Sequence, residues 1–249
     1  MQPVIRNSLA ILVATALPSI AALADTVKLH GATTVVNVVI EPYRNAVQQS
    51  TGHTLEIVGN ATGKGLVDLA DGKADAALVS EPLEIAVAAA KLAGKEIDPA
   101  KLKMFEIRKD EIVFVVNGKN PVGPLTWEQI KDIHLGKITN WKAVGGNDAP
   151  INVYSDAVTG GTRAMVKKLV LNDVDYGANV KSLTAVKRVA ELIAKDENGI
   201  GAVGKGFVDA KDNKIVQTKK IERPLAIVTM GEPSAKVKQV IDAFRAAAK

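Results

Sequence analysis

Residues 27–79 read VKLHGATTVVNVVIEPYRNAVQQSTGHTLEIVGNATGKGLVDLADGKADAALV, and this stretch decides the fold. Short, nearly continuous apolar runs alternate in it with longer stretches of helical spacing, over residues 27–29, 35–50, 54–58, 65–71 and 76–79. Apolar runs of this kind are typical of strands that are buried on both faces of a parallel sheet. The stretch therefore predicts a βαβαβ unit.

A second set of elements of the same kind follows. It predicts strands over 111–117, 151–154, 200–203 and 225–230, and helices over 127–135, 162–171, 184–195 and 235–248. No linker rich in Pro, Gly or Ser separates the two sets. The sequence therefore predicts an α/β fold of two lobes joined by strands that cross between them. The interface of two such lobes is the expected place for a ligand cleft.

The N-terminal segment indicates export. Arg6 is the only charged residue before Asp25, and residues 9–24 read LAILVATALPSIAALA, which is shorter than a membrane span needs. The triplet at 22–24 has the small-x-small pattern of a cleavage site. We expect a signal peptide over residues 1–24 and a mature chain in the periplasm. An uncleaved anchor is the alternative, which Pro18 and the missing charged flank disfavour.

Composition excludes several classes of function. The 249 residues contain no cysteine, so disulfides, thiolate metal sites and cysteine nucleophiles are ruled out. A net charge of +5 without a basic run, together with 4% aromatic residues, argues against nucleic-acid binding. His30, His53 and His134 lack metal-ligand spacing, and no G-x-S-x-G motif occurs. We expect no cofactor, no metal site and no catalytic residue.

Four loops that precede predicted helices carry hydroxyls, glycines or charged side chains. Their candidate ligand-binding residues are Ala32, Thr33 and Thr34; Thr62, Gly63 and Lys64; Ser80 and Glu81; and Gly160, Gly161, Thr162 and Arg163. Helix N-termini attract anions because their first N–H groups are free and the helix dipole is positive there. The structural alternative is that the threonines only cap their helices and that Arg163 points to solvent.

Two stretches look like nucleotide-binding motifs but fail on spacing or context. Residues 59–64 have one residue too few between the glycines for a P-loop, and Gly65 follows the lysine where Ser or Thr is required. Residues 199–204 match G-x-G-x-x-G, but they follow a predicted helix and form a strand themselves. Neither stretch predicts a nucleotide site.

The stretches LTWEQI (125–130), GKITNW (136–141) and VGG (144–146) resemble the phosphate-binding proteins of bacterial ABC phosphate importers. Further agreement lies at GATT (31–34), SEPL (80–83), GTR (161–163), RPL (223–225) and GEPS (231–234). The resemblance covers nearly the whole mature chain. It implies a type II periplasmic binding protein with two Rossmann-like lobes, residues 25–109 plus 222–249 and residues 110–221. It also implies a monomer that closes over a small oxyanion and delivers it to an inner-membrane permease.

The resemblance also implies roles for single residues. The threonine of the family's first loop falls on Thr33, with Thr34 offering the next amide, and the serine of the second loop falls on Thr62. The acid of the third loop, which accepts a proton from the ligand, falls on Ser80 if Pro82 fixes the register, with Glu81 alongside.

The fourth loop departs from the family pattern, which is an arginine followed four residues later by Ser-Gly-Thr. Asp156 stands at the arginine position and Gly160 at the serine position, whereas Gly161, Thr162 and Arg163 match. An inward carboxylate would repel an anion. Three outcomes remain open: an anion site of altered selectivity in which Lys64 or Arg163 replaces the cation, a site for another ligand, or no ligand.

The leading hypothesis is a binding protein that supplies phosphate or a related oxyanion to an importer. An exported sensor or interaction protein on the same fold is the alternative that Asp156 and Gly160 motivate. A periplasmic phosphatase is disfavoured because the sequence shows no nucleophile paired with a base.

Overall fold

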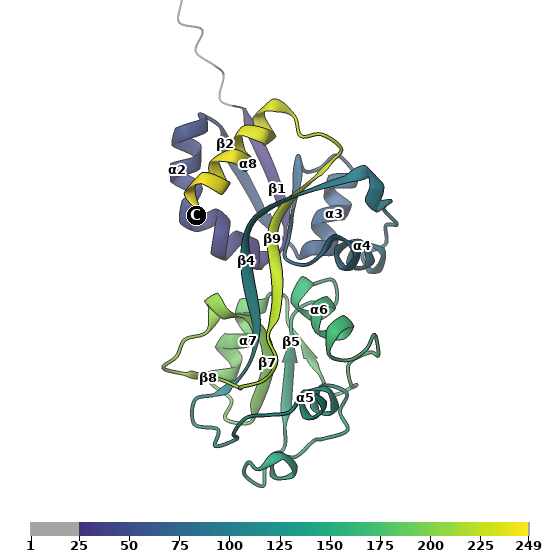
Figure 1. Ribbon diagram of the computed structural model, residues 1–249, viewed down its shortest axis with the longest axis vertical. Helices are drawn as coiled ribbons and strands as arrows, with labels where there is room; N and C mark the ends of the chain where they lie inside the picture. The colour runs from purple at the N-terminus through teal and green to yellow at the C-terminus, as the bar shows by residue number, and fades with distance from the viewer. Residues whose placement is uncertain (1–24, 249) are drawn as a thin grey trace, which may run out of the picture.

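The computed structural model describes residues 25–248, so the expected signal peptide, residues 1–24, lies outside the described residues. Within that part of the chain, no helix is long and apolar enough to cross a membrane. Its helices and strands form two halves, which two long strands connect (Figure 1).

The first half is built on a parallel βαβαβ unit, as the sequence predicts. Its elements are β1 (Thr26–Gly31), α1 (Thr33–Val35), η1 (Val36–Ile40), α2 (Glu41–Thr51), β2 (Thr54–Gly59), α3 (Thr62–Ala70), β3 (Ala76–Val79), α4 (Leu83–Leu92), η2 (Pro99–Lys101) and, from the end of the chain, α8 (Ala235–Ala247). Strand β1 pairs in parallel with both β2 and β3. The first three helical segments follow one another without a break, and η1 is a π-helical turn.

The second half repeats the α/β plan. Its elements are α5 (Trp127–His134), η3 (Trp141–Val144), β5 (Asn152–Ser155), α6 (Gly161–Leu169), β6 (Lys181–Ser182), α7 (Val186–Ile193), β7 (Gly199–Gly204), η4 (Lys205–Phe207) and β8 (Asn213–Ile215). Strand β5 pairs in parallel with β6 and β7. Helix α5 begins with a reciprocal capping box, in which Thr126 and Gln129 each satisfy the other's backbone N–H group.

Strands β4 (Leu102–Asn117) and β9 (Ile221–Met230) are antiparallel neighbours that run through both halves (Figure 1). They join all nine strands into one sheet of order β2-β1-β3-β9-β4-β7-β5-β6, with β8 paired to β4. Each half is therefore tied to the other by two strands. Each half keeps its own core on either side of these two strands.

Each half buries its own apolar core. In the first half, Leu29, Ile40 and Leu78 pack with Phe244 of α8. The terminal helix thereby covers the sheet with the apolar face that its spacing predicts. In the second half, the fully buried Trp141 lies in a separate cluster of eighteen buried residues. The hydrophobic effect therefore stabilises each half through a core of its own.

Several elements differ from the sequence prediction. Strand β9 begins at Ile221 instead of residue 225, and the short strands β6 and β8 were not predicted. Strand β4 begins at Leu102, not at residue 111, because its first part crosses between the halves and alternates exposed charged residues with partly buried ones. Helix α4 was not predicted, since its run of alanines lacks the sharp apolar and polar faces that identify an amphipathic helix.

Candidate functional site

A small cavity of about 10 Å³ lies where the two halves meet. It is lined by Ala32, Thr33, Thr34, Ala61, Thr62, Ser80, Asp156, Ala157, Gly160, Gly161, Thr162, Thr184, Ala185 and Val186. These residues belong to the N-terminal ends of the helical run that starts with α1 and of α3, α6 and α7, together with the loops after β3 and β5. Four positive helix ends therefore face one point, an arrangement that favours negative charge.

Most of the residues expected from the sequence meet at this cavity. Ala32, Thr33, Thr34, Thr62, Ser80, Gly160, Gly161 and Thr162 all line it. Glu81 lies directly behind this lining. Its carboxylate would lie only 1.8 Å from a Cβ built on Gly161, so the first half contacts the second through an acid and a glycine. The hydroxyl of Thr62 donates to Glu81 Oε2 at 3.2 Å.

Besides Glu81, three expected residues do not line the cavity, and two of them are the cations proposed as replacements for the missing arginine. Lys64 is exposed on α3. The guanidinium of Arg163 stacks on Tyr176, 4.1 Å from the ring centroid, and donates to Ser182 Oγ at 3.1 Å. Gly63 serves the contact between α3 and α4, where a Cβ would lie 2.3 Å from the Ala89 carbonyl oxygen. Neither Lys64 nor Arg163 lines the cavity in this structure, so replacement of the arginine by one of them stays a prediction.

The buried cation of the site is Arg223 on β9, which the sequence prediction missed. Only 2% of its surface is exposed. Its Nε and Nη2 donate to Asp110 Oδ2 on β4 at 2.9 and 2.8 Å, and its Nη1 donates to the Thr162 hydroxyl at 2.8 Å. Gly204 leaves room for this pair, since a Cβ there would lie 2.7 Å from Arg223 Nη2. A basic residue inside an otherwise buried strand is the sequence signal that could have identified it.

The acidic residue of the third loop is Glu81, whose side chain is fully buried. It stands one residue after Ser80, the position at which the resemblance places the acid. Ser80 supports it instead, because its N–H and hydroxyl donate to Glu81 Oε2 at 3.0 and 2.9 Å. Burial raises the pKa of Glu81, against the opposing effects of these hydroxyls and of Arg223. Its second oxygen, Oε1, has no hydrogen-bond partner among the described residues.

Asp156 brings a second acid to the cavity. It is 5% exposed, and its Oδ1 has no hydrogen-bond partner within residues 25–248. Burial raises the pKa of Asp156 to about 7; the positive charge of Arg223 opposes this rise and the negative charge of Glu81 adds to it. Two buried carboxyl groups, one from each half, therefore lie at the site: Asp156 in the cavity lining and Glu81 behind it. Each has one oxygen without a hydrogen-bond partner among the described residues.

Two further features of the lining were not foreseen. Thr184, Ala185 and Val186 bring in the N-terminus of α7, whose sequence shows no capping side chain. Ala61, just before α3, has φ 75° and ψ 152°, a backbone conformation that suits glycine and strains any other residue. Such strain is common at ligand sites, where the surrounding structure holds it in place.

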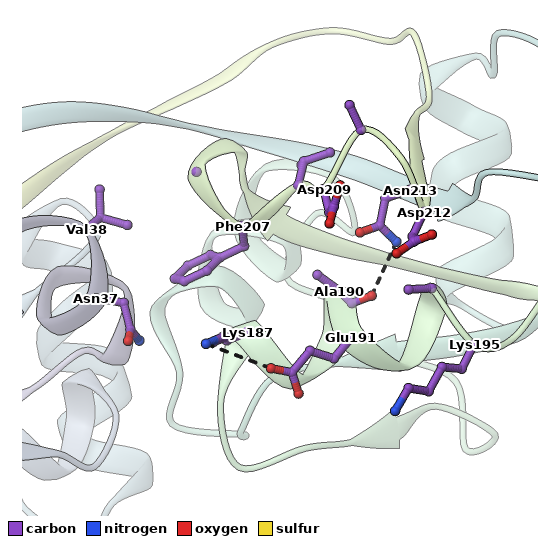
Figure 2. A pocket seen from close by; sticks show the side chains of 14 residues that line it. Asn37, Val38, Lys187, Ala190, Glu191, Lys195, Phe207, Asp209, Asp212 and Asn213 are labelled. Carbon is purple, nitrogen blue, oxygen red and sulfur yellow. Dashed lines mark hydrogen bonds and ion pairs between the residues drawn. The ribbon is translucent and has the colours of Figure 1, made fainter.

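A wider groove of about 780 Å³ lies elsewhere between the halves, and Figure 2 shows its lining. Asn37 and Val38 of η1 face α7, η4 and the loop before β8 across it. Two interactions lie within this lining: Lys187 pairs with Glu191 at 4.0 Å, and Asn213 donates to the Ala190 carbonyl at 3.3 Å. The small cavity has more buried polar residues in its lining than this groove, in which Asn213 is buried. In the part of the chain that the structure describes, no three acidic or histidine side chains gather as metal ligands do.

Comparison with known structures identifies proteins that share this fold. The chain is similar to a putative phosphate ABC transporter substrate-binding protein from Clostridium perfringens, solved with bound phosphate. The two are 29% identical, with a TM-score of 0.76 over 88% of this chain and 92% of that one. It is also similar to an ABC-type phosphate transport receptor from Vibrio cholerae, with 25% identity and a TM-score of 0.66 over 89% and 94% of the two chains.

Among curated proteins, the chain is similar to the phosphate-binding protein PstS of Staphylococcus saprophyticus. The two are 28% identical over 198 residues, which cover 78% of this chain. The match spans only 60% of the length of that relative. The family model described as a PBP superfamily domain matches residues 18–246. With that match and two strands crossing between its halves, the chain belongs to the PBP superfamily and has the type II arrangement of periplasmic phosphate-binding proteins.

Proposed function

We propose that this protein captures phosphate or a related tetrahedral oxyanion in the cavity between its halves and delivers it to an ABC permease. The observation that carries the proposal is the convergence of four helix N-termini, with the hydroxyls of Thr33, Thr34, Thr62 and Thr162, on one small cavity. N–H groups of first helical turns have no partner within their helix and are suited to anion oxygens. The phosphate-binding proteins named above support the choice of ligand.

Each half would supply part of the ligand shell. From the first half, Thr33 and Thr34 offer hydroxyl and amide donors, with Ala32 and Ser80 beside them. Thr62 would turn its hydroxyl from Glu81 Oε2 to the ligand. From the second half, Gly160, Gly161 and Thr162 offer the N-terminus of α6. Glu81 would accept a hydrogen bond from a protonated oxygen of the ligand through its free Oε1.

Capture requires the halves to move. A cavity of about 10 Å³ is smaller than a tetrahedral oxyanion, so the ligand enters when the halves separate. We place the lobes at residues 25–109 plus 222–249 and at residues 110–221, with β4 and β9 as the hinge. A ligand that bonds to both lobes shifts the population toward the closed form.

The same proposal includes the cellular location, the oligomeric state and the partner of the protein. We place the mature chain, from Asp25 onward, in the periplasm as a monomer without enzymatic activity. Its partner would be the inner-membrane permease. Two observations support this location and partner. The N-terminal segment has the pattern of a signal peptide, and the chain is similar to phosphate-transport proteins.

Calorimetric titration with inorganic phosphate tests the function. The protein is first freed of bound anion by unfolding and refolding. We expect Thr62→Val to weaken phosphate binding at least tenfold, because a hydrogen bond to a charged group contributes about 1.5–3 kcal/mol. Thr54→Val, a change of the same kind at an exposed position on β2, is the control and should bind as the native protein does. Equal affinity of the two variants would remove Thr62 from the site.

A second candidate function is an exported interaction protein that binds no anion. Asp156 favours it, since this carboxylate stands where the resembling family has a cation. Absence of a binding signal with phosphate, arsenate, sulfate, molybdate and phosphite would support this second candidate and contradict the first.

A further inference from the structure

We propose that the cavity takes up its oxyanion together with a proton held between Asp156 and Glu81, so that capture tightens as the pH falls. This inference rests on the proposed function and specifies how the same site is regulated and which ligand it takes. The ligand class is a tetrahedral oxyanion that itself carries exchangeable protons, such as phosphate or arsenate.

The geometry brings the two carboxylates to one helix end. A Cβ on Gly160 would lie 2.2 Å from Asp156 Oδ2, and a Cβ on the next residue, Gly161, would lie 1.8 Å from Glu81 Oε2. Two adjacent glycines at the start of α6 therefore contact one carboxylate each. Both carboxylates are buried, and Asp156 Oδ1 and Glu81 Oε1 have no partner among residues 25–248.

The cation nearby does not bond to either carboxylate. The three donor atoms of Arg223 that bond within the described structure are used by Asp110 and Thr162. Arg223 and Asp110 form an ion pair at 2.8 Å. Glu81 Oε2 accepts hydrogen bonds from Thr62 and Ser80, which leaves Glu81 Oε1 and Asp156 Oδ1 without a partner among residues 25–248.

An anion placed between two ionised, buried carboxylates is strongly disfavoured, since like charges in a site of low dielectric repel. One proton on the pair removes one negative charge and turns an acceptor into a hydrogen-bond donor. A carboxyl group can then donate to the anion, while the other carboxylate accepts from a hydroxyl of the ligand. The proton belongs to the pair and is not assigned to one residue.

Other charged and polar groups near Asp156 influence its charge. Arg223 on β9 and Arg163 on α6 attract its charge, and Glu81 repels it. Tyr176 also faces Asp156, but burial raises the pKa of this phenol, so it stays neutral. The raised pKa values of Asp156 and Glu81 accord with a site that holds a proton near neutrality.

The test compares native protein with Asp156→Asn, which keeps the shape of the side chain and removes its titration. Inorganic phosphate is titrated calorimetrically from about pH 6 to about pH 9, in buffers that differ in heat of ionisation. This series gives both the Kd and the number of protons taken up per anion. Asp212→Asn, at an exposed aspartate, is the matched control. Thermal unfolding of each variant checks that it is folded.

We expect the Kd of the native protein to rise more steeply with pH than that of Asp156→Asn, by up to about tenfold per pH unit in the alkaline part of the range. The native protein should also take up about one more proton per anion above neutrality. Since the titration of phosphate itself is common to both proteins, the difference between them isolates Asp156. Asp212→Asn should behave as the native protein does.

Two results would overturn the inference, and they differ in meaning. Equal pH slopes and equal proton uptake in native protein and Asp156→Asn would reject the shared proton while the proposed function stands. No phosphate binding by either protein at any pH would remove the proposed function, and the inference with it.

Discussion

The carboxylate of Asp156 occupies the space that a side chain on Gly160 would need: a Cβ built on Gly160 would lie 2.2 Å from Asp156 Oδ2 and 2.9 Å from the Ala157 carbonyl oxygen. The two residues are also the two departures from the fourth-loop pattern of the phosphate-binding proteins that the sequence resembles. The structure indicates that these departures are one change, since the inward acid requires the glycine.

This dependence predicts a strong coupling between the two positions. Gly160→Ser should destabilise the native protein, because its Cβ meets the Asp156 carboxylate, and the loss should be much smaller in an Asp156→Ala background. Residues in direct contact couple by about 0.5–3 kcal/mol. Urea unfolding of the two single variants and the double variant measures the coupling. Gly123→Ser, where a Cβ meets nothing within 4 Å, is the control for a new serine in a loop. Additive free energies of unfolding would contradict the steric account.

Asp156 also predicts a pH-dependent stability. Its pKa in the folded protein, about 7, lies above its ordinary value of 3.8. Between these two values the folded state holds a proton that the unfolded state has lost, so the native free energy of unfolding falls as the pH rises through this range. Asp156→Asn lacks this effect. We expect its Tm to exceed the native Tm by a margin that grows from about pH 4 and levels off above about pH 8. A margin that does not change with pH would show that Asp156 titrates normally.

The buried ion pair of Arg223 and Asp110 predicts a large loss in the free energy of unfolding when one partner is removed. The side chains are 0% and 8% exposed, and Arg223→Met would leave the Asp110 carboxylate buried without its partner. Such a loss costs about 3–5 kcal/mol, and the double variant Arg223→Met with Asp110→Leu should recover much of it. Arg188→Met breaks the exposed Arg188–Glu191 pair and should cost less than about 1 kcal/mol. Urea unfolding measures the stability of Arg223→Met, of the double variant and of Arg188→Met. A double variant less stable than Arg223→Met alone would contradict this account.

Sequence patterns predict the parts of this protein that depend on local order. The period of the apolar residues indicates the βαβαβ unit of the first half and the face that α8 buries. Because strands and helices alternate, the loops before the helices meet at one edge of the sheet. The order of the elements alone therefore predicts a common site for Thr33, Thr62 and Thr162, and all three line the cavity.

The remaining parts depend on contacts between distant segments, which no local pattern specifies. Arg223 and Asp110 lie 113 positions apart and meet only because β9 pairs with β4. The sequence identifies Asp156 as an acid that opposes an anion, but its nearness to Glu81 follows from how the halves meet. Side-chain direction is likewise invisible in a sequence, so Arg163, at the start of α6, is expected to face the cavity and instead stacks on Tyr176.

The strained backbone before α3 gives the last prediction. Ala61 has φ 75° and ψ 152°, a conformation that glycine adopts freely and that costs other residues about 1–3 kcal/mol. Ala61→Gly releases this strain but gives the unfolded chain more freedom, which costs about 0.4–1 kcal/mol. We therefore expect a net gain in stability of about 1 kcal/mol, measured by urea unfolding. Ala210→Gly, in an exposed loop where φ is not positive, carries the entropic cost alone and should be destabilising. If both variants lose stability equally, the strain at Ala61 makes no measurable contribution, and the alanine is held there by its packing against the cavity.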